Sequence, residues 1–180
     1  MKKSLLWLAL VLTVGASYAQ AQTYRKFKVD MTSGYSRPTS GVGDVSGGLN
    51  LSIEPKYNVT DQIAVGLKFE ATVLASADRI GSDGLLLAVV RSSSLTGEYY
   101  FGSKTVRPYL GVGVGLYRPA IIDTSEGFES IDIGAERQFG FAPRLGLQMG
   151  HFRLGVEYNM VKDSNFFSIK TGTTIGGGRK

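Results

Sequence analysis

Residues 139–159 read FGFAPRLGLQMGHFRLGVEYN, two segments in which every second side chain is apolar. The alternating residues are Phe139, Phe141, Leu145, Leu147 and Met149, and then Phe152, Leu154, Val156 and Tyr158. A period of two is that of a β-strand with one apolar and one polar face. Gly150-His151, between the two segments, has the length of a tight hairpin turn. The stretch therefore predicts two antiparallel strands.

The same alternation recurs in six further segments of about ten residues, at 27–35, 49–57, 63–70, 91–101, 109–117 and 167–175. Eight such segments suit an all-β, up-and-down antiparallel barrel, because a closed sheet leaves no exposed edge. The connections alternate between short (58–61, 102–105, 150–151) and mostly longer, polar ones (37–47, 76–84, 118–136, 161–165). This asymmetry is typical of an eight-stranded transmembrane β-barrel with tight periplasmic turns and long outer loops.

The first 21 residues have the pattern of a signal peptide. Lys2 and Lys3 precede an apolar run at 5–16, and Ala19-Gln20-Ala21 offers small residues for cleavage after Ala21. The run is shorter than the roughly 20 residues of a membrane-spanning helix. We therefore expect a signal peptide at 1–21 and one barrel domain at 22–180. Loss of the two lysines lowers the net charge from +5 to +3, with no basic block to suggest a nucleic-acid partner.

Aromatic residues of the apolar face gather at the two ends of the expected strands. Phe27, Tyr57, Tyr99, Phe101 and Phe152 lie at the tight-turn end, and Tyr35, Phe139, Phe141, Tyr158 and Phe167 lie at the other. Aliphatic residues fill the band between them, as expected for a surface that faces membrane lipid. Arg91 falls on this face and is tolerable if it lies above the interface.

The polar face carries the charges. Five acids and six bases would point inward: Lys28, Asp30, Glu54, Lys56, Lys68, Glu70, Glu98, Arg144, Arg153, Glu157 and Lys170. An eight-stranded lumen is only wide enough for side chains to fill it, and buried charges are costly unless they are paired. We therefore expect a charge-paired plug made chiefly of Glu54, Lys68, Glu70, Glu98, Arg144, Arg153, Glu157 and Lys170. Inward glycines at 111, 113 and 115 would leave room for bulky neighbours such as Arg144 and Gln148.

Catalytic and metal chemistry have little support. The chain has no cysteine and one histidine, His151, which falls in a predicted periplasmic turn. We expect no enzyme activity, cofactor or metal site. Acidic residues between 123 and 136 could gather a cation or a basic partner, but their spacing matches no calcium motif, and a solvated acidic loop is the favoured interpretation.

Three motifs, at 97–101 (GEYYF), 107–115 (RPYLGVGVG) and 140–146 (GFAPRLG), resemble the small outer-membrane β-barrels that include the transmembrane domain of outer membrane protein A. The C-terminal GGGRK resembles a subgroup associated with Bacteroidetes. The resemblance implies a bacterial outer-membrane location, lipid surroundings and insertion by the barrel-assembly machinery. It also implies a structural or surface-interaction role through the outer loops, whose partner the sequence does not identify.

Two alternatives remain at this stage. A secreted, lipocalin-like soluble barrel would turn the apolar face inward around a small apolar ligand. A narrow-conductance porin would share the membrane fold but would let ions pass between the charged side chains. The orientation of the two faces separates the first alternative from the membrane barrel.

Overall fold

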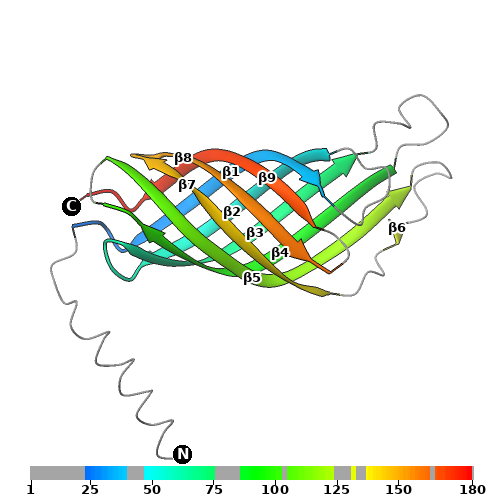
Figure 1. Ribbon diagram of the computed structural model, residues 1–180, viewed down its shortest axis with the longest axis horizontal. Coiled ribbons are helices and arrows are strands. Elements are labelled where there is room, and N and C mark those ends of the chain that lie inside the picture. Colours follow the sequence, from blue (N-terminus) through cyan, green and yellow to red (C-terminus); the bar gives the residue numbers. More distant parts are fainter. Residues whose placement is uncertain are drawn as a thin grey trace, which may run out of the picture.

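The computed structural model describes residues 23–39, 47–75, 86–102, 105–123, 131–132, 137–162 and 165–179 (Figure 1). The predicted signal peptide at 1–21 and most of the predicted outer loops lie outside the described residues. Among the residues described, no helix is long and apolar enough to cross a membrane.

Eight long strands form a closed antiparallel barrel, which confirms the predicted fold. They are β1 (Phe27–Pro38), β2 (Gly47–Asn58), β3 (Ile63–Ala75), β4 (Leu86–Tyr100), β5 (Val106–Asp123), β7 (Gln138–Met149), β8 (Phe152–Val161) and β9 (Phe166–Gly176). Each strand pairs with its neighbours along the chain, and the β1–β9 pairing closes the cylinder. The two-residue β6 (Ile131–Asp132) pairs with the outer end of β5.

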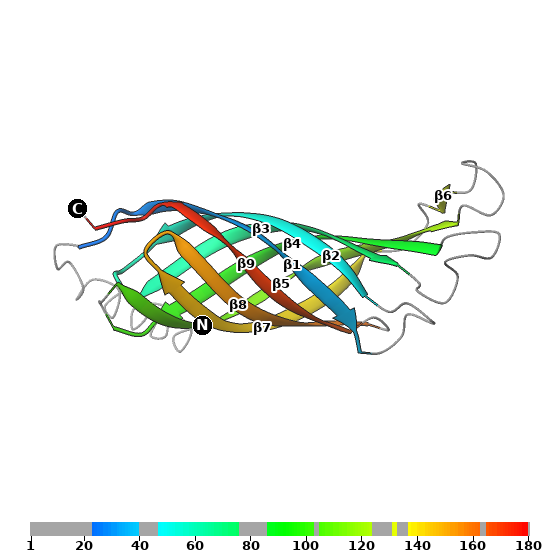
Figure 2. The ribbon, with the colours of Figure 1, turned by 90° about the horizontal axis from the view of Figure 1, so that it is seen from above.

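Strands β4 and β5 are longer than the sequence pattern predicted. The prediction that a loop begins at Arg118 was wrong, because 118–123 continue β5 and pair with 86–91 of β4. Backbone hydrogen bonding between the two strands therefore continues beyond the point where the alternation weakens. Figure 2 shows both strands projecting past the rest of the barrel, at the end opposite the C-terminus.

The two faces have the orientation of a membrane barrel. Leu145 is 56% exposed and points away from the axis, whereas Glu98 is 3% exposed and points inward. The same parity holds for Val112 and Val114, which are exposed, and for Arg144, which is buried. This is the reverse of the orientation that a lipocalin-like barrel requires.

The strand registers define the tilt of the barrel. The row of paired residues that starts at Phe27 on β1 passes once around the cylinder and returns to β1 at Arg37, which is a shear of ten residues. Eight strands with this shear tilt by roughly 40–45°, so that each residue along a strand rises by ~2.4 Å along the axis.

Two prolines lie within strands, and irregular pairing was expected at both. Pro55 has no partner on β3 and Pro143 has none on β8, but the register is the same on either side of each gap. The missing N–H thus interrupts the ladder locally without inserting a bulge.

Candidate functional site

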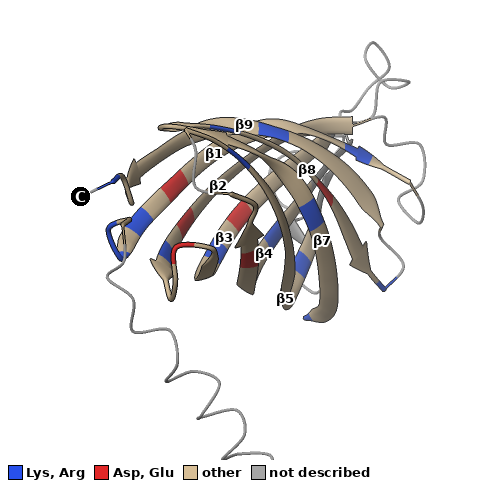
Figure 3. Ribbon diagram, turned by 60° about the vertical axis from the view of Figure 1, so that its left-hand side comes forward, with Lys and Arg blue, Asp and Glu red and all other residues tan. Residues whose placement is uncertain are grey.

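The lumen is filled by charged side chains. Figure 3 shows positive and negative positions on neighbouring strands around the wall. All eleven inward charges are buried, with exposures between 1% and 8%. The structure brings the eight predicted site residues together in one connected set of ion pairs, which also contains Asp30 and Lys56.

The periplasmic half of this set is organised around Lys56 and Glu98. Lys56 Nζ lies 2.7 Å from Asp30 and 2.6 Å from Glu98. Arg153, from the opposite wall, also donates to Glu98 and lies 3.2 Å from Asp30. Each carboxylate thus has at least two cationic partners, which is the condition under which buried charges are tolerated.

Arg144 joins the two halves of the lumen. Its two terminal nitrogens donate to the two oxygens of Glu54 at 3.0 and 2.6 Å, a bidentate geometry. Its Nε lies 3.1 Å from Glu98, and Nη1 lies 3.9 Å from Glu157 in the outer half.

The outer half contains two lysines and two glutamates. Lys68 contacts Glu157 and lies 2.9 Å from Glu70. Lys170 lies 2.5 Å from Glu70 and 3.0 Å from Glu157. The four charges balance, so this half is neutral.

An aromatic and cationic stack lies at the periplasmic mouth. Lys28 Nζ donates to Tyr100 Oη at 2.8 Å and lies 4.2 Å from the centre of that ring. The Arg107 guanidinium lies between Tyr100 and Tyr24, 4.6 and 4.2 Å from their ring centres. Cations over aromatic faces are attracted most where water is excluded. Tyr24 therefore packs over part of the mouth, beside a hollow of about 240 Å³ that Tyr24, Arg107 and Gln148 help to line.

Asp61, in the turn between β2 and β3, holds the N-terminal segment in place. Its carboxylate accepts hydrogen bonds of 3.1 Å from the backbone N–H groups of Thr23 and Tyr24, and its carbonyl accepts one from Arg107. Slight burial opposes ionisation, but these N–H donors outweigh it and hold the pKa of Asp61 below its ordinary value.

Uncharged residues close the outer end of the lumen. Ser36 accepts a 2.7 Å hydrogen bond from Asn50 and shares another of 2.7 Å with Ser168. Beyond them, four buried side chains pack together: Val90, Tyr117, Val161 and Phe166. The free cavity among the lumen charges measures about 20 Å³, room for about one water molecule.

Some details of the packing differ from expectation. A Cβ on Gly111 would lie 2.8 Å from Glu98 and 3.3 Å from Arg144, so this glycine does make room for the network. The expectation that these glycines also make room for Gln148 was wrong, because Gln148 lies opposite Arg107 near the mouth. The Arg107 stack was missed, although extending the period of the fifth strand by two residues would have placed Arg107 inward.

His151 lies in the β7–β8 turn, as its position predicted. Its Nδ1 is 2.8 Å from the carbonyl oxygen of Thr174. Within the described part of the chain, no three His, Cys, Asp or Glu side chains are arranged to hold a metal ion.

Comparison with known proteins supports this architecture. The profile of the outer membrane protein beta-barrel domain matches residues 7–178. Neisserial surface protein A superposes with a TM-score of 0.62 and 17% identity, over 85% of this chain and 98% of that one. The N-terminal barrel of Pseudomonas aeruginosa OprF superposes with a TM-score of 0.53 and 15% identity, over 87% of this chain and 100% of that one. At these identities the likeness shows the fold alone. No curated protein matches the sequence.

Proposed function

The chain belongs to the outer membrane protein beta-barrel domain family of the bacterial outer membrane, and from this premise we propose that it is a closed, non-catalytic barrel with a structural or surface-interaction role. The observation that carries the proposal is the filled lumen. A barrel that neither conducts nor catalyses acts through its wall and its outer loops.

Three features of the lumen support closure. The ion pairs span it from wall to wall, with Arg144 on β7 holding Glu54 on β2. Tyr24 packs on Arg107 at the periplasmic mouth, and the buried cluster around Tyr117 occupies the outer end. Opening a path for ions would require breaking several buried pairs at once, and each break leaves an uncompensated charge.

The outer projection supports a role at the surface. Strands β4 and β5 continue past the barrel and carry β6 beside them (Figure 2). The segment between β5 and β7 is rich in acidic residues, among them Glu126, Glu129 and Glu136. This long connection would present negative charge to a partner outside the cell.

Planar lipid bilayers provide the test. The mature protein is expected to give no stable single-channel steps, whereas a variant with Arg144 and Arg153 both replaced by serine is expected to conduct. Steps in the unmodified protein that change with Arg144→Ser would identify a narrow porin and contradict the proposal. Steps that do not change would show a path outside this network and would contradict it equally.

A second measurement separates the two proposed roles. In a strain that lacks the protein, detergent sensitivity is measured after restoring either the full chain or a chain with 124–136 replaced by a short Gly-Ser turn. Equal rescue indicates a structural role, and rescue by the full chain alone indicates a role of the loop. Rescue by neither would contradict both.

A further inference from the structure

Basic side chains surround the outer edge of the lipid-facing wall. Five described residues in the outer part of the strands, or next to their outer ends, are exposed on this face: Arg37, Arg91, Arg118, Arg137 and Lys162. The acids that the structure describes on β1 to β5 and β7 to β9, apart from Asp123, whose side chain is not described, all point into the lumen. Among these residues the lumen side of the wall therefore carries both signs of charge, whereas its outer surface carries only positive charge.

The strand tilt places Arg91 and Arg118 at similar heights. Arg91 on β4 is ten residues from Phe101, which directly follows that strand, and Arg118 is twelve residues from Val106 at the start of β5. At ~2.4 Å per residue the two arginines lie roughly 24–29 Å above Phe101 and Val106 at the periplasmic end, at the outer boundary of an apolar band about 25 Å tall. At this depth an arginine on the lipid-facing surface costs little free energy, and its side chain lies close to the lipid headgroups.

Three of the arginines are neighbours on adjacent strands. Arg91 pairs directly with Arg118 across β4 and β5. The last pair between β5 and β7 is Tyr117 with Gln138, so the next row brings Arg118 opposite Arg137. Like charges directly opposite each other destabilise a sheet. No described carboxylate lies within ion-pair distance of any of the three, so an anion between them would relieve the repulsion.

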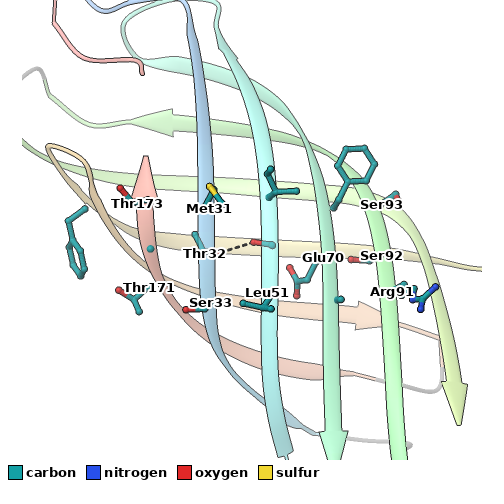
Figure 4. A pocket seen from close by; sticks show the side chains of 16 residues that line it. Met31, Thr32, Ser33, Leu51, Glu70, Arg91, Ser92, Ser93, Thr171 and Thr173 are labelled. Atoms are coloured by element: carbon teal, nitrogen blue, oxygen red, sulfur yellow. Dashed lines mark hydrogen bonds between the residues drawn. The ribbon is translucent and has the colours of Figure 1, made fainter. Parts of the chain in front are cut away.

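A hollow in the wall leads from Arg91 toward the periplasmic end. It has a volume of about 900 Å³ and lies over β1 to β4, β9 and the start of β8. Figure 4 shows Arg91 and Ser93 on one side and Thr171 and Thr173 on the other. The small outward side chains Ser33, Ala71 and Ser93 leave this space between larger neighbours such as Leu51 and Phe69. A flexible hydrocarbon chain fits an apolar groove of this kind.

We propose that Arg91, Arg118 and Arg137 bind the phosphate headgroup of an outer-leaflet lipid, and that an acyl chain of the same lipid lies in the hollow. Guanidinium groups hold phosphate through paired, charge-assisted hydrogen bonds. The lipid-facing Leu116 lies two residues below Arg118 and Phe139 two residues below Arg137, both exposed. These apolar neighbours favour the phosphate of a lipid headgroup over a free phosphate ion from water.

Native mass spectrometry of the mature protein in neutral detergent tests the site. Bisphosphorylated lipid A is the probe, and the same lipid with both phosphates removed is its control. The variant R91Q/R118Q/R137Q is expected to bind the phosphorylated probe at least about tenfold more weakly, because several charge-assisted bonds are lost. The matched variant R25Q/K26Q removes basic charge at the periplasmic end and is expected to bind as the unmodified chain does.

The outcomes are distinct. Equal binding by the triple variant and the unmodified chain overturns the proposal and assigns the arginines to another partner, such as the acidic 123–136 segment. Displacement of the probe by equimolar inorganic phosphate also overturns it, because the site would then recognise a soluble anion. A heat-dependent shift in gel mobility shows that each variant is folded. If the triple variant does not fold, Arg118→Gln alone is compared, with an expected loss of about threefold.

The hollow has a test of its own. Ala71 lies directly beside Arg91 across β3 and β4, so Ala71→Phe would fill the groove just below the headgroup. This variant is expected to weaken binding of the phosphorylated probe, whereas Val112→Phe, on the wall away from the hollow, is expected to leave it unchanged. Equal effects of the two changes would refute the acyl-chain part of the proposal.

Discussion

Arg144 on β7 and Glu54 on β2 meet across the lumen through two parallel hydrogen bonds, 3.0 and 2.6 Å long. The two strands lie on opposite walls of the barrel and share no backbone ladder. The pair therefore connects the two walls from within, beside a free cavity of only about 20 Å³.

Removing one partner is expected to be costly. Arg144→Met should lower the free energy of unfolding by about 3–5 kcal/mol, because Glu54 and Glu98 lose a buried cation. The double variant E54L/R144M should lose less than the sum of the two single changes. Equilibrium urea unfolding in lipid vesicles measures all three, and additive losses would show that the two side chains do not act as a pair.

The packing of Gly111 leads to a second expectation. A Cβ there would lie 2.7 Å from the carbonyl oxygen of Gly97 and 2.8 Å from the Glu98 side chain, so backbone or network must shift. Gly111→Ala is expected to cost about 1–3 kcal/mol. Gly113→Ala is the matched control on the same face, because its Cβ would make ordinary contacts of 3.6 Å or more. The same unfolding measurement compares the two variants. Equal losses in the free energy of unfolding would contradict the steric argument.

Most of what the sequence could predict came from the alternation of inward and outward side chains along the strands. Because side chains alternate strictly, the inward position of Glu98 and the outward position of Leu145 follow from the period alone. Which charges touch does not follow, since Arg144 reaches Glu54 across the lumen from a strand that is not its neighbour. The height at which Arg91, Arg118 and Arg137 lie depends on the shear, which no local pattern encodes.

The strand ends were harder to predict for a related reason. Residues 118–123 pair with β4 through their backbone, and backbone pairing has no residue signature of its own. Tyr24 is held at the mouth by contacts with Arg107 and Asp61, which are distant in sequence. Contacts of this kind arise only once the barrel is closed.

Depth in the membrane supplies a third prediction. Val112 lies near the middle of the apolar band and Leu116 lies near its outer edge, on the same strand and the same face. Val112→Arg is expected to destabilise the barrel by about 2–4 kcal/mol and Leu116→Arg by about 0–1 kcal/mol, because arginine near the interface reaches water. Vesicle unfolding measures both. Equal costs at the two depths would be incompatible with the placement of the bilayer.

Acid is expected to release the N-terminal segment from the mouth. The hydrogen bonds from Thr23 and Tyr24 hold the pKa of Asp61 below its ordinary value, so the ionised carboxylate is favoured in the folded protein. This contribution is complete above the ordinary pKa of about 3.9 and is lost as the pH falls through the lower folded value. A spin label attached at Thr23→Cys should therefore gain mobility on acidification below about pH 3.9. With Asp61→Asn the label should be mobile at every pH. A label that stays immobile in that variant would show that the Arg107 stack, and not Asp61, fixes Tyr24.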